Sequence, residues 1–108
     1  MKKIILYLLI SFGVNASYAE VPSKKDPVSV CGSVEKLAGV IMENRQSGTS
    51  MSHLMKIAKD TKMAEEMIIE AYEQSRFSTE SFQKKSIENF KSRWFLKCFK
   101  QLKSTTNI

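Results

Sequence analysis

The stretch that decides the fold lies near the C-terminus, where Ser78–Lys103 reads STESFQKKSIENFKSRWFLKCFKQLK. Its apolar residues are spaced by three and four, as in an amphipathic helix, and the shared face contains Ile87, Phe90, Trp94 and Cys98. Three more apolar residues widen this face to nearly half of the circumference: Phe95, Phe99 and Leu102. We therefore predict a long helix that opens at Ser78 or Thr79, runs to about Lys103 and points Cys98 into a core.

The residues before this helix predict three shorter helices of the same kind. Ser33 can cap the first, which ends at Gly48 and has the apolar face Val34, Leu37, Ala38, Ile41 and Met42. Ser50 can open the second, with the apolar face Met51, Leu54, Met55 and Ala58. Asp60 or Thr61 can cap the third, with the apolar face Ala64, Met67, Ile68, Ala71 and Tyr72. No stretch alternates as a strand does, so we expect an all-α, small four-helix domain over residues 31–104.

The N-terminal segment has the pattern of a secretory signal peptide. Two lysines precede an apolar run from Ile4 to Val14, and small residues lead to a cleavage site after Ala19. The apolar run is shorter than the roughly 20 residues that cross a bilayer, which disfavours a permanent anchor. We expect a signal peptide over residues 1–19, a flexible tether over 20–30 that contains both prolines, and a disordered tail over 105–108.

The exported chain keeps two cysteines, Cys31 and Cys98. Export leads to an oxidising compartment, where an even pair predicts one disulfide that would close the domain. Chain entropy gives a bond across this loop roughly 4 kcal/mol of stabilisation. Neither cysteine has a further Cys or His at ligand spacing, and Cys31 lies too far from the apolar run for lipid attachment, so we expect neither a metal site nor a lipid anchor.

Methionine and aromatic residues occupy different parts of the chain. The five methionines of the exported chain precede its seven aromatic residues, which begin at Tyr72. We expect flexible methionines to pack around a rigid aromatic helix, since sulfur and aromatic rings attract each other. The alternative is an adaptable methionine groove for a partner helix. Core packing is favoured because all of these methionines except Met63 lie on the apolar face of their helix.

The positive charge is concentrated in the last helix. The whole chain has a formal net charge of +6, whereas residues 20–83 contain eight basic and ten acidic residues. Residues 84–108 contain seven basic residues against Glu88 alone, and four of them share the side opposite Trp94: Arg93, Lys97, Lys100 and Lys103. The acidic row Glu66, Glu70 and Glu73 can neutralise part of this face; an acidic protein or an anionic membrane is the alternative partner. We expect no nucleic-acid binding, because no reader motif is present.

The residues that catalysis requires are not assembled in any motif. His53 is the only histidine and has no cysteine or acid at a spacing that would orient it. The acidic residues of the third helix have the spacing of a solvated face, and no phosphate-binding loop or dinucleotide fingerprint occurs. We therefore expect no catalysis, no cofactor and no metal.

Polar residues beside two turns are candidates for contact with a partner. Arg45 and Gln46 lie near the end of the first helix, and Arg76 lies at the turn before the last one. Binding residues often project from turns on a rigid scaffold. The favoured alternative is that these cations satisfy carbonyl groups at helix ends.

A resemblance covers roughly residues 31–100. The chain resembles a largely uncharacterised group of small exported proteins of Gram-negative bacteria, Acinetobacter-like, and their phages. The positions that carry it are Cys31, Ala38, Ile41-Met42, Arg45-Gln46, Gly48, Met51, Met55, Ala71-Tyr72-Glu73, Arg76-Phe77-Ser78-Thr79, Trp94 and Cys98. The resemblance implies export, paired cysteines and a helical domain, and the phage link favours interference with an envelope protein.

Three functions of different class are consistent with these features. The first is a periplasmic protein that binds and restrains another envelope protein, as immunity proteins and lysis or superinfection regulators do. The second is an envelope-surface protein that binds anionic lipid or cell-wall polymer through the basic helix. The third is a small secreted effector. We favour the first, with Arg45, Gln46, Arg76, Arg93, Lys97, Lys100 and Lys103 as contact residues and the oligomeric state left open.

Overall fold

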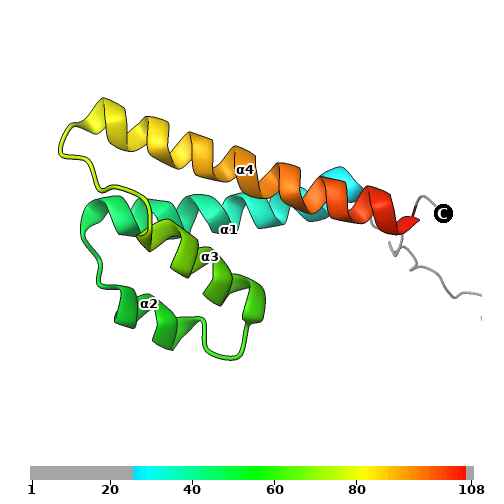
Figure 1. Ribbon diagram of the computed structural model, residues 1–108, viewed down its shortest axis with the longest axis horizontal. Coiled ribbons are helices and arrows are strands. Elements are labelled where there is room, and N and C mark those ends of the chain that lie inside the picture. The colour runs from blue at the N-terminus through cyan, green and yellow to red at the C-terminus, as the bar shows by residue number, and fades with distance from the viewer. Residues whose placement is uncertain (1–25, 107–108) are drawn as a thin grey trace, which may run out of the picture.

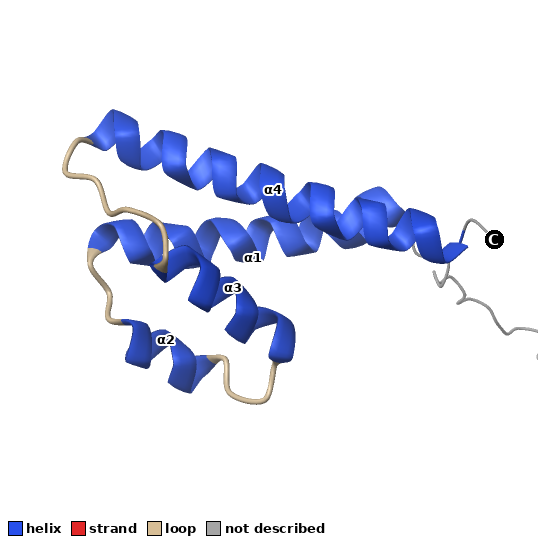
Figure 2. Cartoon of the chain, in the orientation of Figure 1, coloured by secondary structure: helices blue, strands red, loops and turns tan. Residues whose placement is uncertain are grey.

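The computed structural model describes residues 26–106, which form an all-helical domain (Figure 1). Its elements are α1 (Pro27–Ser47), α2 (Met51–Ile57), α3 (Lys62–Tyr72) and α4 (Glu80–Thr106). Short loops join the helices, and no strand occurs in this part of the chain (Figure 2). The predicted all-α, four-helix domain is confirmed. The proposed signal peptide and most of the tether lie outside the described residues.

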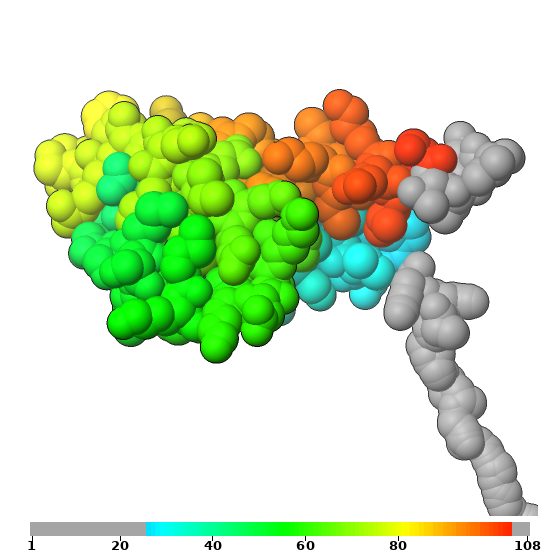
Figure 3. All heavy atoms as spheres, turned by 60° about the horizontal axis from the view of Figure 1, so that its bottom comes forward, coloured from blue at the N-terminus to red at the C-terminus, as the bar shows by residue number. Residues whose placement is uncertain are grey.

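The two long helices, α1 and α4, are antiparallel and make the most extensive contact in the domain (Figure 1). Helix α3 packs on α1, and α2 packs on α3. In the space-filling view, α2 and α3 gather at one end, and the N-terminal part of α1 and the C-terminal part of α4 extend past them (Figure 3). The long helices therefore form the frame, and α2 and α3 cover one part of it.

Helix α1 begins earlier than the prediction. Pro27 occupies its first turn, where the missing N–H costs nothing and the fixed φ favours a helix, and the Val30 N–H donates to the Asp26 carbonyl. The prediction of a cap at Ser33 and of a tether through residue 30 is thus wrong for 27–30. Consequently Cys31 lies within the helix, not ahead of it.

Helix α4 also extends beyond the prediction at its C-terminus. It continues to Thr106, so the predicted disordered tail is wrong for residues 105 and 106. The predicted start is confirmed, since α4 begins at Glu80 and the Gln83 N–H donates to the Thr79 carbonyl.

The predicted helix boundaries around the turns are confirmed. Gly48 ends α1 with a φ of 93°, and the N–H groups of Gly48 and Thr49 donate to the carbonyls of Arg45 and Asn44. Glycine suits this left-handed conformation because it has no Cβ. The Ser50 hydroxyl accepts from the His53 N–H and so caps α2. Thr61 precedes α3, without a hydrogen bond from its side chain.

The core lies where α1, α3 and α4 meet. Phe90 and Trp94 of α4 are buried against Met42 of α1 and the α3 residues Met67 and Ile68. Ile87 and Cys98 are half-buried and pack against this core, as predicted. The predicted packing of methionine with the aromatic helix is confirmed for Met42 and Met67; Met51 and Met55 are half-buried on α2, and Met63 is exposed.

The predicted wide apolar face of α4 needs a correction. Phe95 and Phe99 are only half-buried and lie outside the core cluster. Their rings stack on each other, with centroids 5.9 Å apart. Because α4 contacts mainly one other helix, α1, its buried stripe is narrower than half of the circumference.

The predicted disulfide is present. Cys31 and Cys98 are bonded, with Cα atoms 5.6 Å apart, and join the N-terminal part of α1 to the C-terminal part of α4. A disulfide is consistent with an oxidising compartment outside the cytoplasm. Within residues 26–106, no helix combines the length and the apolar composition that crossing a membrane requires.

Candidate functional site

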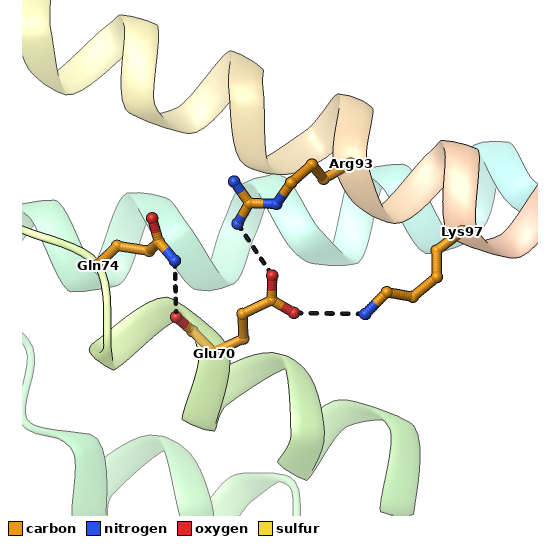
Figure 4. Close-up of polar contacts among 4 residues, drawn as sticks. All are labelled: Glu70, Gln74, Arg93 and Lys97. Carbon is orange, nitrogen blue, oxygen red and sulfur yellow. Dashed lines mark hydrogen bonds and ion pairs between the residues drawn. The ribbon is translucent and has the colours of Figure 1, made fainter.

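An acidic residue of α3 bridges to the basic helix α4. Glu70 accepts from Arg93 Nη2 through Oε2 at 2.9 Å, and its Oε1 lies 3.5 Å from Lys97 Nζ (Figure 4). Gln74 lies one turn after Glu70, and its Nε2 donates to the Glu70 carbonyl. The predicted neutralisation of the basic face by the acidic row is confirmed at this one carboxylate. Partly exposed ion pairs of this kind contribute about 0.2–1 kcal/mol each.

Aromatic rings of the core also hold these two cations. The Arg93 guanidinium carbon lies 5.4 Å from the centroid of the Phe90 ring, and Lys97 Nζ lies 4.1 Å from that of Trp94. Cations over aromatic faces gain electrostatic stabilisation. Arg93 and Lys97 thus each contact a carboxylate and a ring of the core. The prediction that the basic residues lie on the side opposite Trp94 is wrong for Lys97, which is three residues from Trp94 and lies over its ring.

Three hollows follow one another along the side of α4 that faces α3. We call them the loop hollow (Met42, Gln74, Phe77, Phe82, Lys85, Ser86, Asn89, Phe90, Arg93), the Leu96 hollow (Glu70, Arg93, Leu96, Lys97, Lys100) and the Trp94 hollow (Val34, Met63, Trp94, Lys97, Cys98, Gln101, Leu102). Gln74, which follows α3, lines the first hollow, and Glu70 and Met63 of α3 line the other two. Neighbouring hollows share one residue, Arg93 or Lys97, so we call the row of three hollows the groove; Glu70, which pairs with both cations, lines the middle one.

The loop hollow combines apolar and polar walls. Its volume is about 190 Å³, and the buried side chains of Met42 and Phe90 contribute to it. Phe77 and Phe82 are exposed, and their ring centroids are 5.7 Å apart. The cation of Lys85 and the amide and hydroxyl groups of Gln74, Ser86 and Asn89 supply hydrogen-bond donors.

The Leu96 hollow is more exposed and more basic. Leu96 is 54% exposed, and the cations of Arg93, Lys97 and Lys100 surround it. Lys103, a further predicted contact residue, is also exposed and has interactions of its own within the chain. Leu96 therefore exposes apolar surface between cations.

The Trp94 hollow is small and mostly apolar, with a volume of about 110 Å³. The Trp94 Nε1 is buried and has no hydrogen-bond partner among the described residues. Burying such a donor costs about 1–3 kcal/mol, so the packing of the indole ring must outweigh this cost.

The predicted contact residues of α1 have a structural role. Gln46 is buried, with 2% of its surface exposed, and its Nε2 donates to the Ser75 carbonyl at 2.8 Å. Its Oε1 accepts from the Phe77 N–H, also at 2.8 Å. The prediction that Gln46 contacts a partner is wrong, because its side chain is sequestered. It fixes the loop that carries Phe77 instead.

Two arginines complete this attachment of the loop. Arg45 donates from Nε and Nη2 to the Gln74 carbonyl, at 3.2 and 2.7 Å, and lies 5.0 Å from the centroid of the Tyr72 ring. Arg76 Nε donates to the Gln46 carbonyl at the end of α1. Both arginines satisfy carbonyl groups beyond or at helix ends, which is the alternative that the sequence favoured. Together with Gln46 they position one wall of the loop hollow.

Tyr72 is the residue whose titration the fold perturbs. Its hydroxyl donates to the Thr49 carbonyl. Burial raises the pKa of Tyr72 above its usual value of 10.0, and the charge of Arg45 partly opposes this rise. Tyr72 thus links α3 to the turn between α1 and α2, so this pKa shift reports on that link.

Some residues of the groove were not among the predicted contacts. Phe82 and Leu96 lie on the polar side of α4, where a helical wheel shows each as an isolated apolar residue among polar and basic ones. That pattern was available in the sequence. The pairing of Phe82 with Phe77 was not, because it depends on the path of the loop.

A separate hollow of about 390 Å³ lies between α1, α2 and α3. Its lining is mainly apolar, with Val40 and Ile57 exposed, and includes the exposed His53. His53 therefore lies beside aliphatic side chains. Among residues 26–106, no group of histidine, cysteine and carboxylate side chains could hold a metal ion.

The chain was compared with known proteins in three ways. No protein-family model matches it, and no curated protein matches it. No solved structure matches it either. A function for this domain is therefore argued from the geometry of its surface.

Proposed function

We propose that the chain is an exported, non-catalytic protein that binds the acidic surface of another envelope protein, in the manner of an immunity protein or a regulator. The observation that carries this proposal is the Leu96 hollow, where an exposed leucine lies among Arg93, Lys97 and Lys100. Arginine is enriched among the residues that dominate the binding energy of protein interfaces, and cations select acidic partners.

The rigidity of the surface supports a binding role. Arg93 and Lys97 form ion pairs with Glu70 and contact aromatic rings. The disulfide joins α4, which carries both residues, to α1. A surface that is ordered before association loses less conformational entropy on binding. Export of the chain is part of the proposal, and the disulfide supports it.

A second candidate is an anionic membrane or cell-wall polymer. The observation that favours it is the exposure of Phe82 and Leu96, each 54%, on the lysine-rich side of α4. Amphipathic helices that lie on membranes place apolar side chains beside lysines in this way. We favour a protein partner because Leu96 and the cations line a hollow, which a protruding side chain of a protein fills better than a flat lipid surface does.

The experiment compares two charge-reversed variants of the oxidised, exported chain. Leu96→Glu/Lys100→Glu alters the Leu96 hollow, and Lys59→Glu reverses the charge of one lysine on the exposed connection between α2 and α3. Each variant is used to capture proteins from a periplasmic extract, and the captured protein is purified and titrated. We expect one stoichiometric partner for the wild type and for Lys59→Glu, and at least about tenfold weaker binding for the double variant.

Binding to phosphatidylglycerol vesicles is measured with the same variants at low and high salt. Strong binding at low salt that disappears in the double variant, together with no stoichiometric partner, would contradict the proposal and favour the membrane. Equal capture of one partner by all variants would also contradict it, since another surface would then carry the binding.

A further inference from the structure

The loop hollow has the size of a site for a single apolar side chain. Its volume of about 190 Å³ lies below the roughly 300–1,000 Å³ that is usual for small-molecule pockets. Met42 and Phe90 provide buried apolar surface, and the exposed rings of Phe77 and Phe82 border it. Burial of one large side chain here would cover apolar surface that now faces water.

The wall formed by the loop is fixed before any partner arrives. Gln46 accepts from the Phe77 N–H, and Gln83 Nε2 donates to the Phe77 carbonyl at 2.6 Å. The backbone of Phe77 is therefore bonded on both sides, to α1 and to α4. A hollow with such a wall needs little ordering when it is filled.

The polar groups around the hollow select a negative charge. Lys85 and Arg93 are the charged residues that line it, and no carboxylate lines it. Gln74 and Asn89 supply amide donors at the same site. A carboxylate next to the bound apolar side chain would thus meet positive charge and hydrogen-bond donors.

Arg93 lines both the loop hollow and the Leu96 hollow, and it already forms an ion pair with Glu70. The Glu70 side chain is 27% exposed, and its carboxylate bonds Arg93 from the side of the groove opposite α4. An internal carboxylate competes with an external one, because the apparent affinity falls with the fraction of the protein that is free to bind. An ion pair that is partly exposed in this way is weak enough for a partner's carboxylate to replace it.

We infer that the loop hollow receives a large apolar side chain of an acidic segment of the partner protein, and that a carboxylate next to this side chain replaces Glu70 on Arg93. The inference rests on the proposed function, since it names the chemistry of the partner segment. Glu70 is then an internal competitor of the partner, and its removal strengthens binding.

The probe is the acetylated, amidated tripeptide aspartyl-phenylalanyl-aspartate, titrated into the oxidised chain and followed by amide chemical shifts. The peptide with both aspartates changed to asparagine tests the charge, and the peptide with alanine in place of phenylalanine tests the apolar side chain. We expect the largest shifts at Phe77, Ser86 and Asn89, and weaker binding of both control peptides.

Two matched pairs of variants test the assignment. Glu70→Gln should bind the acidic peptide about two- to fivefold more tightly than the wild type, whereas Glu66→Gln, the same change one turn earlier on α3, should not. Lys85→Gln should weaken binding severalfold, whereas the neighbouring Lys84→Gln, which does not line the hollow, should not. Phe82→Ala removes an exposed ring and should weaken binding without unfolding the domain.

Equal affinity of the Glu70→Gln and Glu66→Gln variants would overturn the inference, as would weaker binding of Glu70→Gln. Shifts confined to Leu96 and Lys100, or equal binding of the asparagine peptide, would overturn it too. Shifts at Phe77 and Asn89 caused by phosphatidylglycerol vesicles and not by the peptide would assign the site to lipid and also contradict it.

The same variants separate this inference from the proposed function. If the captured partner protein is lost from Leu96→Glu/Lys100→Glu but binds Glu70→Gln and Phe82→Ala like the wild type, the proposed function stands and the inference fails. If the peptide binds as expected but no partner protein is captured, the inference stands and the proposed function fails.

Discussion

At one end of the α1–α4 pair, the Cys31–Cys98 disulfide joins the helices, whereas at the other end the Gln46 side chain joins α1 to the loop before α4. The first connection is covalent and restricts the unfolded chain. The second consists of hydrogen bonds to the buried Gln46 amide, which stabilise the folded protein only while the loop keeps its position. The disulfide end supports the domain, and the Gln46 end shapes the surface beside the loop hollow.

Removal of the disulfide should have the largest effect on stability. Cys98→Ser opens a link between residues 67 positions apart, which the chain-entropy model values at about 4 kcal/mol. Denaturant unfolding should show this loss, and reduction of the wild-type chain should reproduce it. An unchanged midpoint would mean that helix packing alone maintains the domain.

Removal of the Gln46 amide should have a smaller effect on stability and a local effect on the loop. Gln46→Ala leaves the Ser75 carbonyl and the Phe77 N–H without their partner, at a cost of about 2–3 kcal/mol. Amide exchange at Phe77 should accelerate, while the region around Cys31 keeps its protection.

The matched control is Ser47→Ala, because Ser47 is the exposed neighbour and bonds only the carbonyl of Glu43 in its own helix. Its effect should stay within about 0.5 kcal/mol. If both variants have the same small effect, the loop is held by other contacts and our account of this end is wrong.

Of these changes, alkaline pH should lower the free energy of unfolding by the smallest amount, through Tyr72 near the Gln46 end. Burial raises the pKa of Tyr72, so the unfolded chain loses this proton at a lower pH than the folded chain does. The contribution of Tyr72 is therefore complete below about pH 10 and is lost as the pH rises towards the folded pKa. Unfolding curves between pH 8 and 11 should show this decline.

Tyr72→Phe provides the comparison for the pH series. It removes the titrating hydroxyl together with its hydrogen bond to Thr49, so it should start less stable and decline less steeply with pH. Parallel curves for the two proteins would show that Tyr72 does not contribute to the decline.

The two ends also differ in how far the sequence predicts them. Two cysteines in an exported chain have one pairing, and the spacing of Phe90, Trp94 and Cys98 defines the buried face, so the helices and the disulfide follow from local pattern. The early start of α1 does not follow from local pattern, because residues 27–30 show no apolar period and the helix there depends on Pro27 in its first turn.

The contacts of Gln46 could not be predicted because they join residues about 30 positions apart. A glutamine near a helix end is ordinarily exposed, and nothing in its neighbours marks this one as buried. For the groove, the predicted basic face supplied Arg93, Lys97 and Lys100, and Glu70 belonged to the predicted acidic row. The choice of Glu70 over Glu66 and Glu73 depends on how α3 lies beside α4.

The most direct test of the account is the ratio of two dissociation constants for the acidic phenylalanine peptide, that of Glu70→Gln divided by that of Glu66→Gln. Both variants lose one negative charge from α3, so the ratio isolates the position of that charge in the groove. We expect a ratio well below one, between about one half and one fifth. A ratio of one or more would contradict it, since Glu70 would then stabilise the domain without competing with a ligand.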